Sequence, residues 1–417
     1  MSSIKGKKIL ILGGNALTID IVNAAHALGL YTIVTDWNTP DKSPAKLVAD
    51  EYWMDSLSDI ENLKRKIEAH HVSGIITGFS DSYLPYYARL CKVANLPCYA
   101  TEEVFEQTLD KAQFKQLCQA YDVPVVPEYN ADTFTPAKLS PSNRVIIKPV
   151  DNSGSRGIVI CDNPKEWQVQ LAYSKSFSAS GHVLIEQYME CDDISFEYKI
   201  QDGEIILSSI CDRYIYKTAH FGSVTKELIY PSNYTDRYLR EVNDRVIAMF
   251  KAMHLQNGVL FMQAFADNEG FYFYEMGYRL SGGRHFIFTE NQNNSNAAKE
   301  LCHFAVTGSM ADYSLKERNN PNFKDLCCQI SILCKGDTTI YSIKGLEELR
   351  SLSQIIDLTT YYHPGETVGK EGTTAQIFAR VHIVVRTQKE LTSIKQHIFQ
   401  TLSVQDKFGN QLIIKTL

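Results

Sequence analysis

The first hundred residues alternate short apolar runs with segments of helical periodicity, and this alternation restricts the fold more than any other feature. Expected strands lie at 8–12, 31–35 and 74–77, and expected helices at 19–28, 60–70 and 83–94. Strands that alternate with helices form a parallel sheet covered by those helices. The sequence therefore predicts a Rossmann-like α/β domain over residues 1–100.

The turn after the first expected strand, Gly13-Gly14-Asn15, is similar to the phosphate-binding turn of dinucleotide-binding domains. The third glycine of that pattern is absent, and Pro40 breaks the chain soon after Asp36, the acid that would bind a ribose. We therefore expect this domain to pack and to line a substrate cleft without binding a dinucleotide.

The chain has 417 residues, of which 44% are hydrophobic and 22% charged, which is typical of a globular protein of about three domains. With a net charge of −6 and no long Lys/Arg-rich run, it lacks the basic stripe of a general nucleic-acid binder. No apolar stretch approaches the roughly 18 residues of a membrane span, and Ile9-Leu10-Ile11-Leu12 is too short for a secretion signal. Ten cysteines without a Cys-x-x-Cys pair indicate reduced thiols. A cytoplasmic protein with neither nucleic-acid nor membrane partners is expected.

Residues 101–312 mix helices and strands without strict alternation, so we expect an α+β region there. Its expected strands lie at 145–149, 183–187, 194–200, 204–210, 258–266 and 271–276. Turn residues at 202–203 and 268–270 predict antiparallel hairpins. A small C-terminal α+β domain follows from residue 313, with strands near 328–333, 379–385 and 411–415 and a helix at 388–401.

The segment from Val145 to Gly157 is the most informative for function. An apolar strand ends in Lys148 and passes into a loop with glycines, serines and an arginine. The lysine supplies a fixed cation and the loop supplies backbone and hydroxyl donors, so together they suit a polyphosphate. The spacing of a Walker loop is absent, which argues against a P-loop fold.

Two neighbouring segments, the helix that begins at Lys111 and the strand at 183–187, indicate nucleotide binding only in combination with the segment 145–157. Lys111 opens a helix whose N-cap is Asp110, and alone it would be a charged residue on a helix surface. The strand at 183–187 runs into a polar turn and then into Asp192 and Asp193. Backbone groups at such a strand edge can bind adenine, and an acid just beyond can bind ribose hydroxyls.

A second cluster lies on the last two expected strands of this region. In an antiparallel pair, Gln263 and Glu275 stand side by side, where their oxygens could hold Mg²⁺ against phosphates. Arg279 follows Glu275 by four residues, and Gly282 and Gly283 offer bare backbone N–H groups. This end of the hairpin suits an anionic substrate or a transferring phosphoryl group.

In their order along nearly the whole chain, these elements resemble the ATP-grasp superfamily, in the branch of biotin carboxylase, the carbamoyl-phosphate synthetase large subunit and L-amino acid ligases. The resemblance implies a pre-ATP-grasp domain at 1–100, an ATP-grasp domain at 101–312 with a mobile lid near 130–190, and a C-terminal domain at 313–417. It also implies ATP and Mg²⁺, or Mn²⁺, as cofactors, and a homodimer, which is common among the relatives.

The resemblance assigns roles to residues of this sequence. Lys148 and Arg279 are the expected catalytic residues, and Glu275 and Gln263 are the expected metal ligands. The residues expected to contact ATP are Lys111, Lys148, Ser153, Gly154, Ser155, Gly157, Glu186, Gln187, Tyr188, Met189 and Asp193. The residues expected to contact substrate are Arg279, Gly282, Gly283, Arg284 and Glu227.

Several positions depart from the family pattern. Gln263 replaces an acidic metal ligand, Gly277 replaces an asparagine ligand, and Asp193 replaces a longer glutamate, with Cys191 in place of a glycine. Glu275, water and phosphate oxygens can still hold one Mg²⁺, because that ion commonly binds through only one or two carboxylates.

The resemblance implies a ligase in which a carboxylate attacks the γ-phosphate of ATP, and an amine or related nucleophile then displaces the phosphate of the acyl phosphate. A small-molecule carboxylate and a nucleophile are the expected partners, and a C–N bond is the expected product. The alternative is a catalytically weak ATP-binding subunit with a regulatory or assembly role, which Gln263 and Gly277 motivate. The chain has no Gly-x-Ser-x-Gly elbow or Cys/His nucleophile signature of a hydrolase.

Overall fold

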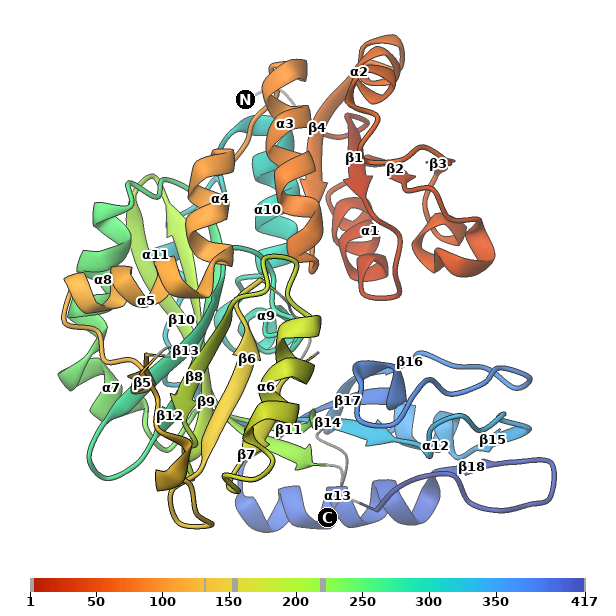
Figure 1. Ribbon diagram of the computed structural model, residues 1–417. Coiled ribbons are helices and arrows are strands. Elements are labelled where there is room, and N and C mark those ends of the chain that lie inside the picture. The colour runs from red at the N-terminus through yellow and green to blue at the C-terminus, as the bar shows by residue number, and fades with distance from the viewer. Residues whose placement is uncertain (1–3, 131–132, 152–156, 218–222, 416–417) are drawn as a thin grey trace.

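The computed structural model describes residues 4–130, 133–151, 157–217 and 223–415 (Figure 1). The N-terminal lobe contains a parallel sheet in the order β3-β2-β1-β4, which confirms the Rossmann-like arrangement. Its elements are β1 (Lys8–Leu12), α1 (Thr18–Ala27), β2 (Tyr31–Thr35), β3 (Glu51–Trp53), α2 (Ile60–Ala69), β4 (Val72–Thr77) and α3 (Leu84–Ala94). The three-residue strand β3 was not expected from the sequence.

Asp36 closes the loop that follows β1. Its carboxylate accepts hydrogen bonds from Gly14 N at 2.9 Å and Ser43 Oγ at 2.8 Å, and it pairs with Lys46 Nζ at 2.8 Å. The acid that a dinucleotide-binding domain would offer to a ribose is therefore occupied inside the domain.

Helix α10 (Ala297–Thr307) follows the central strands in the sequence and packs on α1 and β4 of the N-terminal lobe, residues 4–94 (Figure 1). A Cβ atom at Gly74 of β4 would lie 2.2 Å from the carbonyl oxygen of Ala305, so a glycine is needed for this close approach. This contact joins the N-terminal lobe to the rest of the molecule.

A single antiparallel sheet runs through the central and C-terminal parts in the order β13-β12-β9-β10-β11-β14-β17-β16. Its strands are β9 (Asp192–Gln201), β10 (Glu204–Lys217), β11 (Ser223–Tyr230), β12 (Gly258–Ala266), β13 (Phe271–Gly277), β14 (Leu326–Leu333), β16 (Ile355–Thr360) and β17 (Ile377–Val385). Both expected hairpins, β9–β10 and β12–β13, are confirmed. The sheet crosses residue 313 because β11 pairs with β14.

A smaller antiparallel sheet, in the order β5-β8-β6-β7, occupies the region between residues 128 and 187. It consists of β5 (Glu128–Tyr129), β6 (Val145–Pro149), β7 (Val159–Cys161) and β8 (Val183–Gln187), with α6 (Trp167–Ser176) beside it. Ile147, Trp167 and Ile185 belong to a separate small core. This lobe therefore packs around side chains of its own.

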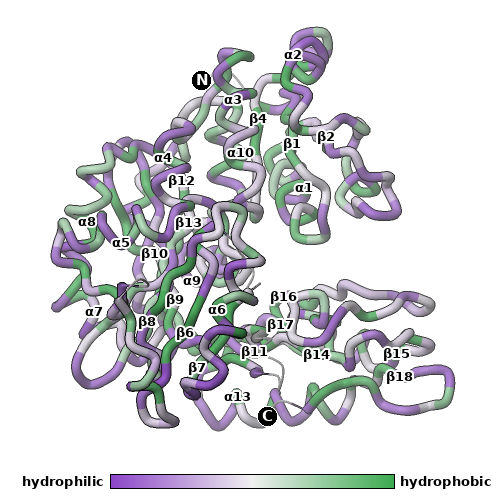
Figure 2. The backbone as a smooth tube through the Cα atoms, viewed as in Figure 1, coloured by the Kyte–Doolittle hydropathy of each residue, from purple (hydrophilic) through white to green (hydrophobic). Residues whose placement is uncertain are grey.

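The remaining elements complete the covering of the sheets. The helices are α4 (Glu102–Leu109), α5 (Lys111–Ala120), α7 (Thr235–Glu241), α8 (Asn243–Ala252), α9 (Phe286–Asn293), α11 (Leu315–Arg318), α12 (Leu346–Arg350) and α13 (Gln388–Thr401). Strands β15 (Ser342–Lys344) and β18 (Ser403–Gln405) form a pair. Short 3₁₀ helices lie at Pro40–Lys42, Pro44–Leu47, Asp81–Tyr83, Pro136–Lys138 and Thr374–Gln376. Figure 2 shows β1, β4 and β6 as mostly hydrophobic, whereas hydrophobic and hydrophilic residues alternate along α2 and α13.

The prediction of a strand at 411–415 is wrong. Gln411 and Ile413 make only isolated bridges, to Gln405 and Cys334 respectively. The expected helix at 388–401 is confirmed, and Thr387 caps it by accepting a hydrogen bond from Glu390 N. All ten cysteines are free thiols, as the sequence predicts.

Candidate functional site

A buried carboxylate is shared by two lysines where β6, β8 and α5 meet. Glu186 of β8 is 1% exposed and forms ion pairs with Lys148 of β6 and Lys115 of α5. Because Ile146 lies opposite Glu186 in the β6–β8 register, Lys148 lies diagonally across from it on the same face. Burial raises the pKa of Glu186, but the two lysines outweigh burial, so that its pKa lies below the ordinary value. The charged carboxylate fixes both ammonium groups.

Lys111 lies one helical turn before Lys115 on α5, so both point to one side of that helix. Burial lowers the pKa of Lys111 and so does the charge of Lys148, whereas Glu275, Asp81 and Glu186 act in the opposite direction. The pKa of Lys111 is lowered overall. The charged residues that act on Lys111 therefore come from β6, β8, β13 and the segment after β4, so these four parts of the chain lie around one lysine.

The expected metal ligands lie side by side, because Gln263 of β12 is opposite Glu275 of β13. The Tyr274 hydroxyl lies 3.0 Å from Gln263 Oε1. A Cβ atom at Gly277 would lie 2.4 Å from the ring of Phe261, so an asparagine does not fit there beside Phe261. One carboxylate and one amide oxygen suit a single Mg²⁺ that takes its other ligands from phosphate and water. The described residues contain no cluster of three His, Cys, Asp or Glu side chains suited to a metal ion.

Asp193, the expected ribose ligand, is held by two residues that sequence reasoning missed. Its Oδ1 lies 3.0 Å from Arg213 Nη1 and 2.9 Å from the Tyr274 hydroxyl. Burial raises the pKa of Asp193, and Glu275 raises it further, against the lowering effects of Arg213 and Tyr274. Arg213 lies beyond the strand expected at 204–210, and a bulge between Leu207 and Ser209 shifts the register so that Arg213 lies opposite Asp193. The sequence pattern therefore gave no signal for this pair.

The turn after β8 was expected to meet adenine. Gln187 N donates to Pro127 O at 2.9 Å and Tyr188 N donates to Arg144 O at 3.0 Å. Within the described ranges the Met189 N–H makes no hydrogen bond. That donor is therefore available to a nucleobase.

Only the end of the expected phosphate loop is described. Ser153, Gly154 and Ser155 lie outside the described residues. Gly157 has a φ of +76°, and a Cβ atom there would lie 2.5 Å from Phe177 Cβ, so its backbone requires glycine.

Arg279 follows β13 and forms a bidentate ion pair with Asp81 of the N-terminal lobe. Its Nε lies 2.5 Å from Asp81 Oδ1, and its Nη2 lies 2.6 Å from Asp81 Oδ2. The guanidinium carbon lies 4.9 Å from the ring centroid of Phe261. Asp81 was missed, although an acid after a strand of a parallel sheet lies at the edge where such sheets bind ligands.

Two expected substrate residues are engaged elsewhere. Arg284 is 3% exposed, and its fork contacts both carboxylate oxygens of Asp20 at 2.7 Å and Asp357 Oδ2 at 2.8 Å. Glu227 of β11 pairs with Lys395 Nζ at 2.6 Å. Substrate binding by either residue would require these pairs to open, and both roles stay predictions.

The two glycines after Arg279 are held through their backbones. Gly282 O accepts a hydrogen bond from Arg380 Nη1 at 2.6 Å, and Gly283 N donates to Ser281 Oγ at 3.2 Å. The loop 279–284 is therefore fixed by contacts to other parts of the chain.

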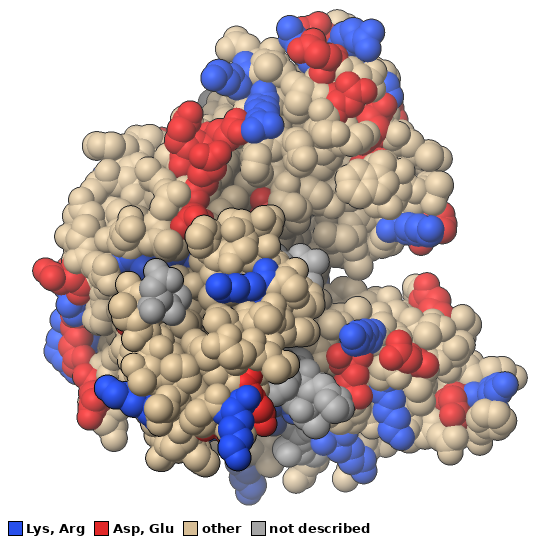
Figure 3. Space-filling model, viewed as in Figure 1, with Lys and Arg blue, Asp and Glu red and all other residues tan. Residues whose placement is uncertain are grey.

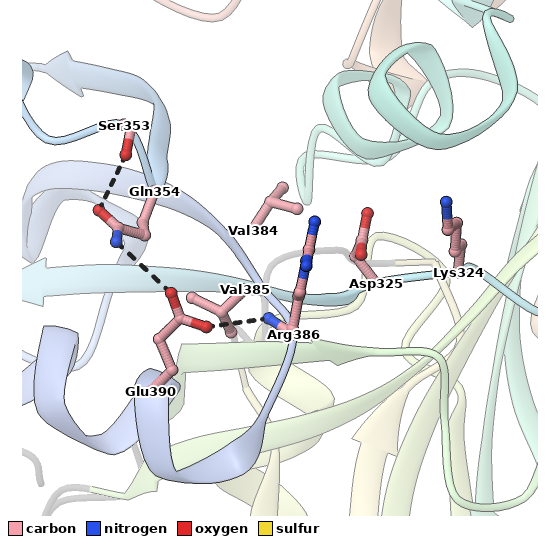
Figure 4. A pocket seen from close by; sticks show the side chains of 8 residues that line it. All are labelled: Lys324, Asp325, Ser353, Gln354, Val384, Val385, Arg386 and Glu390. Carbon is pink, nitrogen blue, oxygen red and sulfur yellow. Dashed lines mark hydrogen bonds between the residues drawn. The ribbon is translucent and has the colours of Figure 1, made fainter.

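An open groove in the C-terminal lobe, residues 313–415, contains none of these residues. Figure 4 shows Lys324, Asp325 and Arg386 at this groove, while Glu390 accepts hydrogen bonds from Arg386 N and Gln354 Nε2. The helices of the described ranges are all too short or too polar to cross a bilayer.

A family model described as the ATP-grasp domain matches residues 142–285. The L-amino acid ligase of Bacillus licheniformis has a TM-score of 0.78 and 18% identity, covering 97% of this chain and 99% of that one.

Two further proteins are similar along most of the chain. The biotin carboxylase domain dimer of Hydrogenobacter thermophilus 2-oxoglutarate carboxylase, solved with MgADP, ADP and bicarbonate, has a TM-score of 0.76 and 19% identity over 96% of this chain and 91% of that one. The uncharacterized protein y4rH of Sinorhizobium fredii is 23% identical over an alignment of 415 positions, which covers 95% of this chain and 83% of y4rH.

Proposed function

We propose, on the premise that this chain belongs to the ATP-grasp superfamily, that it is an ATP-dependent ligase that joins a small-molecule carboxylate to an amine. The observation that carries this proposal is the convergence of Lys111, Lys148, Glu275 and Arg279 from three separate segments, namely α5, β6 and the end of β13. Cations beside a carboxylate are what a nucleoside triphosphate and its metal ion require.

The nucleotide is proposed to bind between the small sheet and the large sheet. Lys111 and Lys148 contact the phosphates, the backbone at 186–189 contacts adenine, and Asp193 contacts the ribose. The small sheet acts as the mobile lid. Support comes from the available Met189 N–H and from the MgADP bound by the related biotin carboxylase domain.

Glu275 is proposed to hold one Mg²⁺, with the Gln263 amide oxygen as a second ligand. The bound ion screens the negative charge of the phosphate oxygens. Gln263 keeps a free lone pair for this role, because Tyr274 uses only one of the two on the amide oxygen.

The reaction is proposed to pass through an acyl phosphate. A carboxylate oxygen attacks the γ-phosphorus and ADP leaves; the amine nitrogen then attacks the acyl carbon, and phosphate leaves with that carboxylate oxygen. Arg279 and Lys148 stabilise the transferring phosphoryl group, since this chemistry depends mainly on position and charge. Gly282 and Gly283 lie beside the substrate.

Phosphate release from MgATP tests the proposal, with pooled carboxylates and pooled amines added separately and together. Release that requires both pools is expected for the wild-type protein and is lost in Lys148→Met. The exposed Lys165→Met is the matched control and should retain the rate. Absence of release in every combination would contradict the proposal.

The second candidate, an ATP-binding subunit with weak turnover, is favoured by one observation, the amide of Gln263 at a metal-ligand position. Gln263→Glu separates the two candidates. A large gain in ATP hydrolysis would indicate a decayed site, whereas loss of a substrate-dependent rate would indicate that glutamine belongs to a working ligase.

A further inference from the structure

Arg380 of β17 is a buried guanidinium without a carboxylate beside it. The residue is 9% exposed. Its Nη1 donates to Gly282 O at 2.6 Å and lies 3.4 Å from the Tyr361 hydroxyl. Its Nε is buried without an acceptor, and Arg380 forms no ion pair with any residue that the structure describes.

The two other arginines that meet at this place are neutralised. Arg279 is paired with Asp81, and Arg284 is paired with Asp20 and Asp357. A buried charge without a partner is costly, which is why buried arginines normally contact acids. The three aspartates balance the three arginines in number, but none of them forms an ion pair with Arg380. Its unused donor capacity therefore points to an anion that arrives from outside the chain.

Burial lowers the pKa of Arg380, and the nearby positive charge of Arg284 acts in the same direction. Tyr361 and Asp20 oppose this effect without cancelling it. An anion at Arg380 would relieve this electrostatic cost.

The position of Arg380 suits a substrate. Figure 3 shows a notch between the N-terminal and C-terminal lobes, and Arg284 joins α1 to β16, one element from each lobe. A Cβ atom at Gly282 would have only Leu17 Cδ1, at 3.9 Å, within van der Waals distance, so the space beside this glycine is open. Through its hydrogen bond to Gly282 O, Arg380 contacts the loop 279–284. The same loop begins with Arg279, the residue proposed to stabilise the transferring phosphoryl group.

We propose that Arg380 binds a non-reacting anionic group of the substrate, a carboxylate or a phosphate, with the Tyr361 hydroxyl as a second donor. A guanidinium can hold either group through two parallel hydrogen bonds. This inference rests on the proposed function, because it assigns to the ligase a substrate with a second negative charge besides its reacting carboxylate.

Equilibrium binding without nucleotide tests the inference by isothermal titration. The probes are inorganic phosphate and two matched pairs, succinate with butyrate and glutarate with pentanoate. The wild-type protein is expected to bind phosphate or a dicarboxylate more tightly than the matched monocarboxylate. Tighter binding of phosphate identifies a phosphorylated substrate, and tighter binding of a dicarboxylate identifies a second carboxylate.

Arg380→Gln should weaken that binding at least tenfold. Arg386→Gln, an exposed arginine just beyond the end of β17, is the matched control and should bind as the wild type does. The affinity of Arg380→Gln for a non-hydrolysable ATP analogue should be unchanged. That measurement distinguishes failure of this inference from failure of the proposed function, in which the wild type would bind no nucleotide.

The melting temperature separates ligand binding from packing. The desolvation of a buried guanidinium that has no ion pair outweighs its one short hydrogen bond to Gly282 O, so Arg380→Gln should melt no lower than the wild type. The inference is overturned if no probe binds the wild type, if Arg380→Gln binds as tightly as the wild type, or if lost binding comes with a lower melting temperature.

Discussion

Replacement of Glu186 by glutamine removes the carboxylate that two buried lysines share. Lys115 and Lys148 are 4% and 7% exposed, so neither ammonium group can recover its hydration without a structural change. Removal of one partner from a buried ion pair costs about 3–5 kcal/mol. We expect Glu186→Gln to lower the free energy of unfolding by about that amount, measured by urea denaturation.

Glu190→Gln is the matched control, because the Glu190 side chain is 72% exposed in its pair with Arg144. Its cost should be about 0–1 kcal/mol. A double-mutant cycle with Lys115→Met should give a coupling energy of about 0.5–3 kcal/mol. Equal losses for Glu186→Gln and Glu190→Gln would refute the reasoning.

The acid stability of the protein gives a second readout of the same carboxylate. The pKa of Glu186 is lowered on folding, so its stabilisation is fully present above the ordinary value of 4.5 and is lost as the pH falls through the lower folded value. Glu186→Gln should lack this part of the acid-induced loss.

Three further predictions concern other residues. Burial and the charge of Arg213 lower the pKa of His285 to about 3, and burial lowers that of His382 to about 4. The unfolded chain then binds more protons, so the free energy of unfolding should fall as the pH is lowered from 6.5 to 4, by at most about 1.4 kcal/mol per pH unit for each histidine. Urea titrations that show constant stability over this range would contradict this. Arg279→Ala should lower kcat by about 10²–10³ with unchanged affinity for an ATP analogue, measured by phosphate release and titration. Gly277→Asn should cost about 1–3 kcal/mol in thermal unfolding because of its overlap with Phe261, and Phe261→Leu should relieve it.

The sheets were predictable where local turn chemistry and side-chain alternation agree. Asp202 and Gly203 both have positive φ values, of 51° and 80°, as a tight hairpin turn requires. That turn sets the register of β9 and β10. The corresponding turn between β12 and β13 pairs Ala264 with Phe273, and a bulge between Gln263 and Ala264 then shifts the register so that Gln263 lies opposite Glu275. The presence of both proposed metal ligands on neighbouring strands followed from the sequence, whereas the bulge that aligns them did not.

Contacts between distant segments could not be predicted in this way. Asp81 and Arg279 are 198 residues apart, and their pairing depends on how the N-terminal lobe sits against the end of β13. Side-chain periodicity also fails to predict a strand where the segment finds too few neighbouring strands to form a hydrogen-bonded ladder. Residues 411–415 have an apolar centre typical of a strand, but they meet neighbouring segments only at single bridges.

The central claim, that a substrate carboxylate is activated as an acyl phosphate, is tested most directly with a carboxylate labelled with ¹⁸O. Once phosphate release has identified the substrate pair, one ¹⁸O atom should pass from the carboxylate into the released phosphate, as mass spectrometry of the phosphate would detect. Unlabelled phosphate, or label found instead in AMP, would contradict the account.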